Sequence, residues 1–482
     1  MASCLSRVFS EEELEDIRLR AIDWALAHGI SMRSSNLSED QDKVVHAPFT
    51  LFPTTIPESN LQQATQSMVY FSRLMHHVAM DHQLLQQSFK HVIETDEFSN
   101  KLWQIYLQIK DDNRVQPVSL GLFRNDFMLD EKKDSPGSET TFQIKQIEFN
   151  SIASSFGGLV SQQYFLHRYV MDFAGEKNTE KQMPYNRPVE GLATGLIKAW
   201  ELYQNKKAVI LFLVSHNERN VMDQRFLEYE IYKQNKNIKV IRKTFDDLVK
   251  DGKLAEDRKY FIGKEEVGVV YYRVGYAPTD YTTDKIWDVR LELEKAWCIK
   301  CPPIQYQLVG AKKIQQVLAK PSILDKYISD VSIKQLIQST FAGQYSLDKG
   351  EEGDKALNMA VNNPDQFVLK PQREGGGYNM YDEEMKRFLE VNRESNERAG
   401  YILMEKVRPK PQVNYLVKAG IPFIKSLCIS ELGIYGCYIG NKNEEIYNEN
   451  CGHLLRTKTA DTNEGGVCAG FSGIDTPFVI PQ

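Results

Sequence analysis

The stretch that decides the fold is Phe367-Val-Leu-Lys-Pro-Gln-Arg-Glu-Gly-Gly-Gly-Tyr-Asn-Met-Tyr381. It begins as a short apolar run with strand character and then changes abruptly to charged residues and three glycines. Consecutive glycines let backbone amides approach oxygen atoms that a Cβ would keep away, while Lys370 adds a positive charge and Glu374 an oxygen ligand for Mg²⁺. The spacing matches neither the P-loop nor the Rossmann fingerprint. The stretch predicts a polyphosphate site, and the alternative is a hairpin turn with a solvated charge cluster.

The composition is that of a large globular chain. Of its 482 residues, 42% are hydrophobic and 26% are charged, so about three structural units are expected. The net charge of −6 gives no global electrostatic reason to expect nucleic acid or an anionic membrane as a partner. The longest apolar run, Ala208–Val214, is too short to span a bilayer, and the N-terminus lacks a signal peptide's apolar core. Because the seven cysteines show no disulfide-framework spacing, we expect a cytoplasmic protein.

A predicted strand over Phe142–Phe149 carries a candidate metal site. The period of a strand places Glu148 and Asn150 on the same face. Two adjacent side-chain oxygens at a strand end suit Mg²⁺, and the alternative is a surface glutamate beside a turn-forming asparagine. An earlier strand, Pro117–Phe123, is expected to end just before Arg124.

A turn of small residues, Ser151–Gly158, leads into a predicted helix over Leu159–Phe173. Backbone amides at a helix N-terminus, together with the hydroxyls of Ser154 and Ser155, can bind a carboxylate. The alternative is that the turn only caps the helix.

Three continuous apolar runs, Lys207–Ser215, Ile238–Ile241 and Val267–Arg273, with a helix near Met222–Gln234, predict a compact parallel sheet. Ligands of such sheets lie beyond the carboxyl ends of the strands. The polar residues that follow the first and last runs are Glu218, Arg219, Asn220, Gln224, Arg273 and Tyr276. They favour a zwitterionic substrate over an ordinary surface loop.

The C-terminal third adds further candidate ligands. A predicted strand over Tyr401–Val407 places Met404 where it could contact an adenine, although such residues are also common in cores. A predicted strand over Ile424–Glu431 ends in a carboxylate. The glycine-rich segment Glu464–Gly470 could act as a second mobile loop over charged substrates.

With these residues assembled, the sequence resembles the eukaryotic glutathione synthetase family of ATP-grasp ligases over almost its whole length. The motifs that carry the resemblance are Gln146-Ile-Glu-Phe-Asn150, Glu218-Arg-Asn220 with Asp223-Gln224, Lys370-Pro-Gln-Arg-Glu-Gly-Gly-Gly377, Ile402-Leu-Met-Glu-Lys406, Ile429-Ser-Glu-Leu-Gly433 and Gly452-His-Leu-Leu-Arg-Thr-Lys458. The resemblance implies an α/β ATP-grasp fold with a parallel-sheet substrate-binding insertion and a mobile lid. The implied domains are residues 1–206 (an N-terminal helical layer and the first part of the core), 207–311 (the insertion) and 312–482, with the lid at about 340–412.

The activity implied by the resemblance is ligation of γ-glutamylcysteine to glycine through an acyl phosphate, with ATP as co-substrate, Mg²⁺ as cofactor and a homodimer as the assembly. The implied metal ligands are Glu148, Asn150 and Glu374. The implied nucleotide site comprises Glu148, Lys312, Lys370, Gln372, Glu374, Gly375, Gly376, Gly377, Asn379, Tyr381, Met404, Glu405, Lys406, Val407, Glu431, Lys458 and Glu464. The implied peptide contacts are Arg124, Ile152, Ala153, Ser154, Ser155, Glu218, Arg219, Asn220, Gln224, Arg273, Val274, Gly275, Tyr276, Arg456, Val467 and Cys468. The cations assigned to catalysis are Arg124, Lys312, Lys370, Arg273 and Arg456, because an acyl phosphate brings a carboxylate against an anionic phosphate.

Four residues depart from the pattern expected of the family: Ala153, Val274, Glu464 and Cys468. None belongs to the implied metal set, and Glu464 and Cys468 bear on the choice between glycine and β-alanine as acceptor. Two rival functions remain open, a small-molecule kinase with the same grip on ATP and a catalytically inactive nucleotide-binding regulator. The presence of Glu148, Asn150, Lys370 and Glu374 argues against the inactive regulator.

Overall fold

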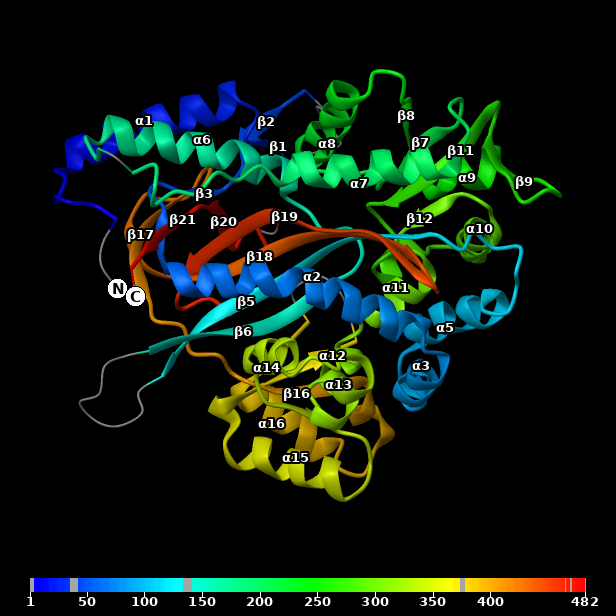
Figure 1. The fold of residues 1–482 in the computed structure, drawn as a ribbon. Coiled ribbons are helices and arrows are strands. Elements are labelled where there is room, and N and C mark those ends of the chain that lie inside the picture. The colour runs from blue at the N-terminus through cyan, green and yellow to red at the C-terminus, as the bar shows by residue number, and fades with distance from the viewer. Residues whose placement is uncertain are drawn as a thin grey trace.

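The computed structural model describes residues 4–34, 42–132, 141–177, 179–372, 378–463, 465–468 and 470–481. Glu374, Gly375–Gly377 and Glu464 lie outside the described residues, so the predictions made for them stay predictions. The chain forms a mixed α/β structure in which a large central sheet is flanked by helices and by two further sheets (Figure 1).

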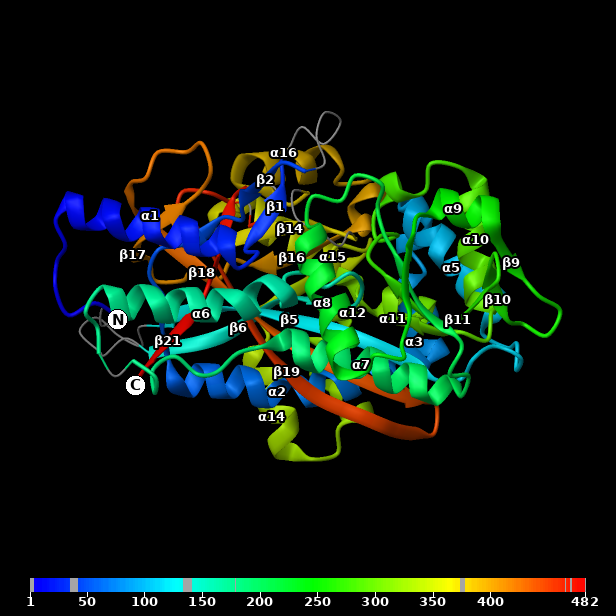
Figure 2. The same ribbon diagram turned by 90° about the horizontal axis from the view of Figure 1, so that it is seen from above.

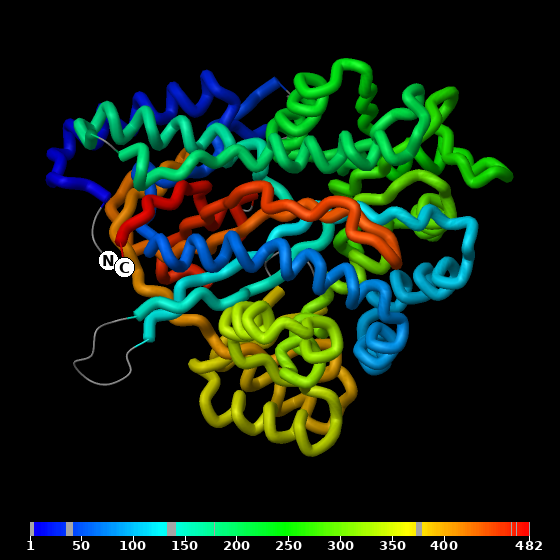
Figure 3. The backbone as a smooth tube through the Cα atoms, in the orientation of Figure 1, coloured from blue at the N-terminus to red at the C-terminus, as the bar shows by residue number. Residues whose placement is uncertain are grey.

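The central sheet has seven strands. In spatial order they are β17 (Gln412–Val417), β3 (Phe49–Thr50), β20 (Ser472–Asp475), β19 (Glu444–Thr459), β18 (Lys425–Asn441), β5 (Ser119–Lys132) and β6 (Thr141–Asn150). Neighbouring strands are antiparallel except for β20 and β3, and β17 also pairs with β18. Figure 3 shows how β5 and β6, in cyan, lie beside β18 and β19, in orange and red, although about 300 residues separate them in sequence.

The two faces of this sheet are covered by different helices. Helix α2 (Glu58–Met80) covers one face, where Phe71 packs against Phe127 with ring centroids 6.3 Å apart. Helices α6 (Gly157–Phe173) and α7 (Pro188–Tyr203) cover part of the other face (Figures 1 and 2). Helix α7 comes very close because Gly195 faces Cys437, whose Sγ lies only 2.3 Å from where a Cβ would stand.

The predicted parallel sheet is confirmed. Its parallel strands are β8 (Val240–Lys243), β7 (Val209–Leu213), β11 (Glu265–Tyr272) and β12 (Ile299–Cys301), extended in antiparallel fashion by β10 (Tyr260–Ile262) and β9 (Gly252–Leu254). Helix α8 (Val221–Gln234) matches its predicted range closely, whereas β8 begins two residues later than predicted.

A four-stranded antiparallel sheet lies below the central one in Figure 1. Its strands are β13 (Gln344–Ser346), β16 (Tyr401–Glu405), β14 (Phe367–Pro371) and β15 (Met380–Tyr381), and its helices are α15 (Glu351–Asn362) and α16 (Asp382–Val391). It has a core of its own that includes Leu357, Phe367, Met385 and Leu403. Helix α16 stops at Val391, and the 3₁₀-helix η3 (Asn396–Gly400) follows.

The remaining elements frame these sheets. They are α1 (Glu11–Ala27), β1 (Ser31–Arg33), β2 (Val44–His46), β4 (Thr54–Pro57), α3 (His82–Phe89), α4 (Val92–Thr95), α5 (Glu97–Ile109), α9 (Phe245–Asp251), η1 (Pro278–Asp280), α10 (Asp284–Lys295), α11 (Ile304–Val309), α12 (Lys312–Leu318), α13 (Pro321–Tyr327), α14 (Val331–Thr340), η2 (Pro364–Gln366) and β21 (Pro477–Ile480). Within the described ranges, no helix has the length and apolar character needed to cross a bilayer.

Two predicted strand ends were wrong. Strand β5 continues through Arg124 to Lys132, and β18 continues through Glu431 to Asn441. Polar residues that were expected to terminate these strands therefore lie inside the sheet, where Asp126 of the same strand compensates the charge of Arg124, and Arg456 of the neighbouring strand β19 compensates that of Glu431.

Candidate active site

One face of the central sheet changes from apolar to charged along its strands. Leu120 and Leu122 of β5 are buried in the core that contains helices α6 and α7. Further along the same face of β5, Asp126 lies opposite Glu148 of β6 and Gly433 of β18. On the next pair of strands, Glu431 of β18 lies opposite Arg456 of β19. Because side chains opposite each other share a face, the pairing gathers this charged cluster without any contribution from loops.

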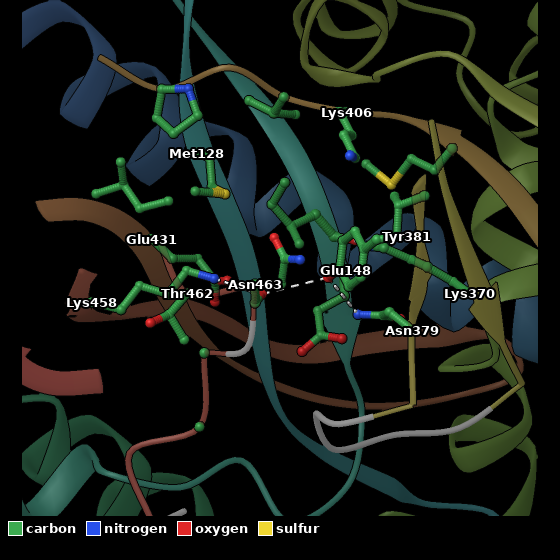
Figure 4. A pocket seen from close by; sticks show the side chains of 18 of the residues that line it. Met128, Glu148, Lys370, Asn379, Tyr381, Lys406, Glu431, Lys458, Thr462 and Asn463 are labelled. Atoms are coloured by element: carbon green, nitrogen blue, oxygen red, sulfur yellow. Dashed lines mark hydrogen bonds between the residues drawn. The ribbon is translucent and has the colours of Figure 1, made fainter. Parts of the chain in front are cut away.

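A cavity lies between the charged face and the four-stranded sheet. The residues predicted to bind nucleotide that line it are Glu148, Lys312, Lys370, Asn379, Tyr381, Met404, Glu405, Lys406, Val407, Glu431 and Lys458. In Figure 4 the side chains of Glu148, Lys370, Glu431 and Lys458 lie around the same space. Gln372 is the exception among the described nucleotide candidates, since it lies outside the cavity and its Oε1 accepts the N–H of Lys313 at 2.9 Å.

Two buried lysines from different elements line the cavity. Lys312 Nζ, at the start of α12, lies 2.7 Å from Glu148 Oε2. Lys370 Nζ, on β14, donates to the carbonyl of Ile147 at 2.9 Å. Among the described residues, no carboxylate lies within ion-pair distance of the Lys370 ammonium. Burial, reinforced by repulsion from Lys312, lowers the pKa of Lys370 to about 8.

The carboxylates of the cavity are held by these cations and by Arg456. Burial alone would raise the pKa of Glu148, but Lys312, Lys370 and Arg456 together hold that pKa well below its usual value. Arg456 is ion-paired with Glu431, whose pKa burial nevertheless raises. Glu148 is thus an ionised carboxylate at the cavity wall.

Asp126, for which the sequence predicts no role, joins the cavity to a second cluster. Its carboxylate is fully buried and accepts from Arg124 Nε and Nη2 at 2.7 and 2.8 Å, from Arg456 Nη2 at 3.0 Å and from Asn150 Nδ2 at 2.8 Å. No motif marks a single aspartate of this kind, and two of its three partners, Asn150 and Arg456, are remote in sequence.

The second cluster surrounds the turn before α6. Arg124 Nη1 donates to the carbonyl of Ser155 at 3.4 Å, and Arg273 Nη2 donates to Ser155 Oγ at 2.7 Å. Arg273 Nη1 also donates to the carbonyl of Ser154 at 2.9 Å. The turn therefore lies between the guanidinium of Arg124 in the central sheet and that of Arg273, which directly follows strand β11 of the parallel sheet, and Ile152 of the turn is buried.

Of the two interpretations left open for the helix α6 amides, the structure favours capping. Asp223 of α8 accepts from the backbone N–H groups of Phe156, Gly158 and Leu159 at 2.8, 2.8 and 3.2 Å. These amides are occupied by a protein carboxylate, so the alternative interpretation, helix capping, holds for them. Asp223 was noticed in a motif and given no role.

The other peptide candidates converge near the carboxyl ends of β7 and β11. Glu218 accepts from Gln224 Nε2 at 2.6 Å and from the N–H of Asn220 at 2.8 Å. Arg219 Nη1 donates to the carbonyl of Cys468 at 3.1 Å. The remaining described candidates are Ala153 in the turn, buried Val274 and Val467, and Gly275 and Tyr276, whose amides donate to Asp280.

The predicted magnesium set is described only in part. Among the described residues, no group of three or more His, Cys, Asp or Glu side chains is arranged as a metal site, and Glu374 lies outside them. The register keeps Glu148 and Asn150 on one face of β6, as predicted. Because the Asn150 amide nitrogen is engaged by Asp126, its oxygen is the atom suited to a hard cation, and the donor set fits Mg²⁺.

Comparison with known proteins places this arrangement in a family. The family model described as eukaryotic glutathione synthase, ATP binding domain, matches residues 11–479. The chain belongs to the eukaryotic glutathione synthase family. Among the members of that family, it is 42% identical to glutathione synthetase of Xenopus laevis over 100% of both chains, and 41% identical to glutathione synthetase of Homo sapiens over 98% of both.

The chloroplastic glutathione synthetase of Arabidopsis thaliana is 36% identical, over 98% of this chain and 88% of that protein. Among solved structures, a glutathione synthetase-like effector from Globodera pallida has the same fold, with a TM-score of 0.80 and 24% identity over 99% of this chain and 100% of that one.

Proposed function

We propose that the protein catalyses the ATP-dependent ligation of γ-glutamylcysteine to glycine, which yields glutathione, ADP and phosphate. Membership of the glutathione synthase family supports this function. The observation in the structure that carries it is the position of Lys370, a buried ammonium that lines the cavity with only a carbonyl as its described partner. An anionic phosphate would complete its surroundings, since a buried charge needs a compensating charge.

On this proposal, different residues of the cavity would bind the adenine and the phosphates of ATP. Met404 and Val407 offer apolar surface for an adenine, while Lys312 and Lys370 lie on the side suited to the phosphates. Glu148, Asn150 and Glu374 would hold Mg²⁺, which when bound offsets the phosphate charge. The phosphates of ATP would compete with Glu148 for Lys312, and Mg²⁺ would compete with Lys312 for Glu148, so we expect the 2.7 Å ion pair to open on binding.

Chemistry would take place between the cavity and the turn at Ser154 and Ser155. The cysteinyl carboxylate of γ-glutamylcysteine attacks the γ-phosphorus and displaces ADP, which forms an acyl phosphate. The amine of glycine then attacks the acyl carbon, phosphate leaves, and the nitrogen loses its proton. Arg124, Arg273 and Arg456 offset the negative charge that accumulates, and no enzyme nucleophile is needed because the substrate carries the intermediate.

On this proposal the fold is an ATP-grasp fold with domains at residues 1–206, 207–311 and 312–482. Residues at about 340–412 act as the lid, which excludes water from the acyl phosphate. The separate core of the four-stranded sheet supports a lid that moves as a unit. The family resemblance further leads us to propose a cytoplasmic homodimer with small-molecule substrates and no nucleic-acid or membrane partner.

One assay tests the function directly. The purified protein is incubated with ATP, Mg²⁺, γ-glutamylcysteine and either glycine or β-alanine, and the product is identified by mass. We expect glutathione, with phosphate release that needs both substrates. A stable phosphorylated small molecule without a peptide product would favour the kinase alternative.

The metal assignment has its own test. Glu374→Ala should lower Mg²⁺-dependent turnover severely and leave the circular dichroism spectrum and melting temperature near those of the wild type. Wild-type turnover in this variant would refute the assignment of Glu374.

A further inference from the structure

We propose that Asp126 is the positioning residue that couples the nucleotide cavity to the turn at Ser154 and Ser155, an inference that rests on the proposed function. Its carboxylate holds two arginines at once, Arg124 at 2.7 and 2.8 Å and Arg456 at 3.0 Å. Each arginine extends to a different part of the site.

The two arginines lead in different directions from Asp126. Arg456 lines the cavity and is ion-paired with Glu431, which lines it too. Arg124 donates onward to the carbonyl of Ser155 in the turn. A continuous series of charged contacts therefore runs from the nucleotide cavity to the turn, and Asp126 is its middle member. Asn150, a proposed metal ligand, is tied to the same carboxylate at 2.8 Å.

The fold makes room for this carboxylate at one position on the neighbouring strand. Gly433 of β18 lies opposite Asp126, and a Cβ there would stand 2.6 Å from Asp126 Oδ1 and 2.8 Å from Arg124 Cδ. Both distances are shorter than real Cβ contacts, so any larger residue would displace the Arg124–Asp126 pair. The need to leave room for Asp126 and Arg124 thus explains why the Ile429-Ser-Glu-Leu-Gly433 motif ends in glycine.

Because both arginines bind the same carboxylate, the position of one guanidinium depends on the position of the other. A bidentate carboxylate–guanidinium pair fixes orientation as well as charge. If either arginine shifts toward an incoming anion, Asp126 keeps less of its charge compensated and holds the other arginine more strongly. Asp126 itself contacts no substrate in this arrangement, so its effect passes through Arg124 and Arg456.

The test is a double-substitution cycle read through KM and kcat for γ-glutamylcysteine and for ATP. Arg124→Gln and Arg456→Gln are measured singly and together, once in the wild-type chain and once in Asp126→Asn. We expect the fold-increases in KM for γ-glutamylcysteine to be non-multiplicative in the wild-type chain and multiplicative in Asp126→Asn. Asp126→Asn alone should raise that KM by roughly tenfold or more. Multiplicative effects in the wild-type chain would overturn the proposal.

Two further variants separate positioning from stability. Asp475→Asn removes another fully buried carboxylate of the same sheet, one that is bonded to threonine hydroxyls. It should change the melting temperature without changing either KM. Gly433→Ala keeps every charge and should raise KM for γ-glutamylcysteine in the same direction as Asp126→Asn. If Asp126→Asn does not fold and Gly433→Ala has wild-type KM values, the proposal fails.

Failure of the proposed role of Asp126 can be distinguished from failure of the proposed enzymatic function. Glutathione formation by the wild-type protein tests the function alone. Calorimetric titration with γ-glutamylcysteine, with and without Mg·ADP, measures the coupling without turnover. A wild-type protein whose affinity for γ-glutamylcysteine is the same with and without Mg·ADP would refute the coupling even if glutathione is made.

Discussion

Two regions of the molecule bury charged side chains, and they compensate those charges in different ways. In the candidate site, Lys370 lines a cavity and Asp126 is held by two guanidinium groups. Away from it, Lys300 Nζ is enclosed by backbone carbonyls, with that of Ala296 at 2.9 Å, and Asp475 accepts from two threonine hydroxyls at 2.5 Å. All four residues are less than a tenth exposed.

The difference shows that burial alone does not mark a functional charge. Lys300 and Asp475 have neutral partners that belong permanently to the fold, so a ligand would add nothing to them. Lys370 faces the cavity, where an anion could bind it. The two arginines are paired with carboxylates that an incoming anion could replace. A buried charged side chain is a candidate for a functional site when the chain itself does not compensate its charge fully and a ligand could do so.

The two lysines give the largest expected effect. Lys370→Met should lower kcat/KM for ATP by roughly 100-fold or more, because it removes a preorganised cation from a water-poor phosphate site. Lys300→Met, the matched control, removes an ammonium that is equally buried and should alter only the melting temperature. Steady-state kinetics and thermal melts of both variants check this. Equal losses of activity in the two variants would show that the distinction between the regions is wrong.

The arginines provide the next effect. Arg456→Ala should raise KM for γ-glutamylcysteine by roughly tenfold, because the guanidinium that faces the cavity and Asp126 is lost. The wild-type value of kcat/KM for each substrate is the reference. Kinetics unchanged for both γ-glutamylcysteine and glycine would remove Arg456 from the site.

Much of the architecture could be predicted from sequence because it depends on local patterns. The runs that became β7 and β11 are continuous and apolar, as strands buried on both faces should be, and a helix was expected between them over nearly the range of α8. The predicted ends of β5 and β18 were wrong because each was placed where charged residues follow an apolar run. A polar residue after an apolar run suggests a strand end, unless a distant strand compensates it, as Arg456 does for Asp126 across 330 residues.

Within the candidate site, too, residues in local motifs could be predicted and residues with remote partners could not. Residues inside glycine-rich or charged motifs, such as Lys370 and Glu148, could be proposed from chemistry and from family resemblance. Asp126 and Asp223 could not be given roles, because Asp126 links Arg124 to the remote residues Asn150 and Arg456, and Asp223 acts on a remote segment. For Asp223 those groups are backbone amides 64 to 67 residues earlier, which no side-chain motif records.

The smallest effect concerns Asp475, and its sign follows from its neutral surroundings. Burial raises the pKa of Asp475 to about 6 from an ordinary value of 3.8, against the hydrogen bonds of its threonine neighbours. The folded protein therefore binds this proton more tightly than the unfolded chain, and the stability it contributes is lost as the pH rises through about 6. The Asp475→Asn variant has no carboxyl group to ionise at this position, so it does not lose this stability as the pH rises. Relative to the wild type, its free energy of unfolding should gain roughly 1 kcal/mol between pH 5 and pH 7.5.

Denaturant melts of both proteins at several pH values measure this difference directly. His167 has the opposite dependence, because burial lowers its pKa to about 4 and its contribution to stability grows as the pH rises toward 6.5. Since His167 is present in both proteins, its contribution largely cancels in the difference. A difference in unfolding free energy that stays constant across the range would mean that Asp475 is ionised throughout. The two buried aspartates, Asp126 and Asp475, would then no longer differ in how their surroundings treat a negative charge.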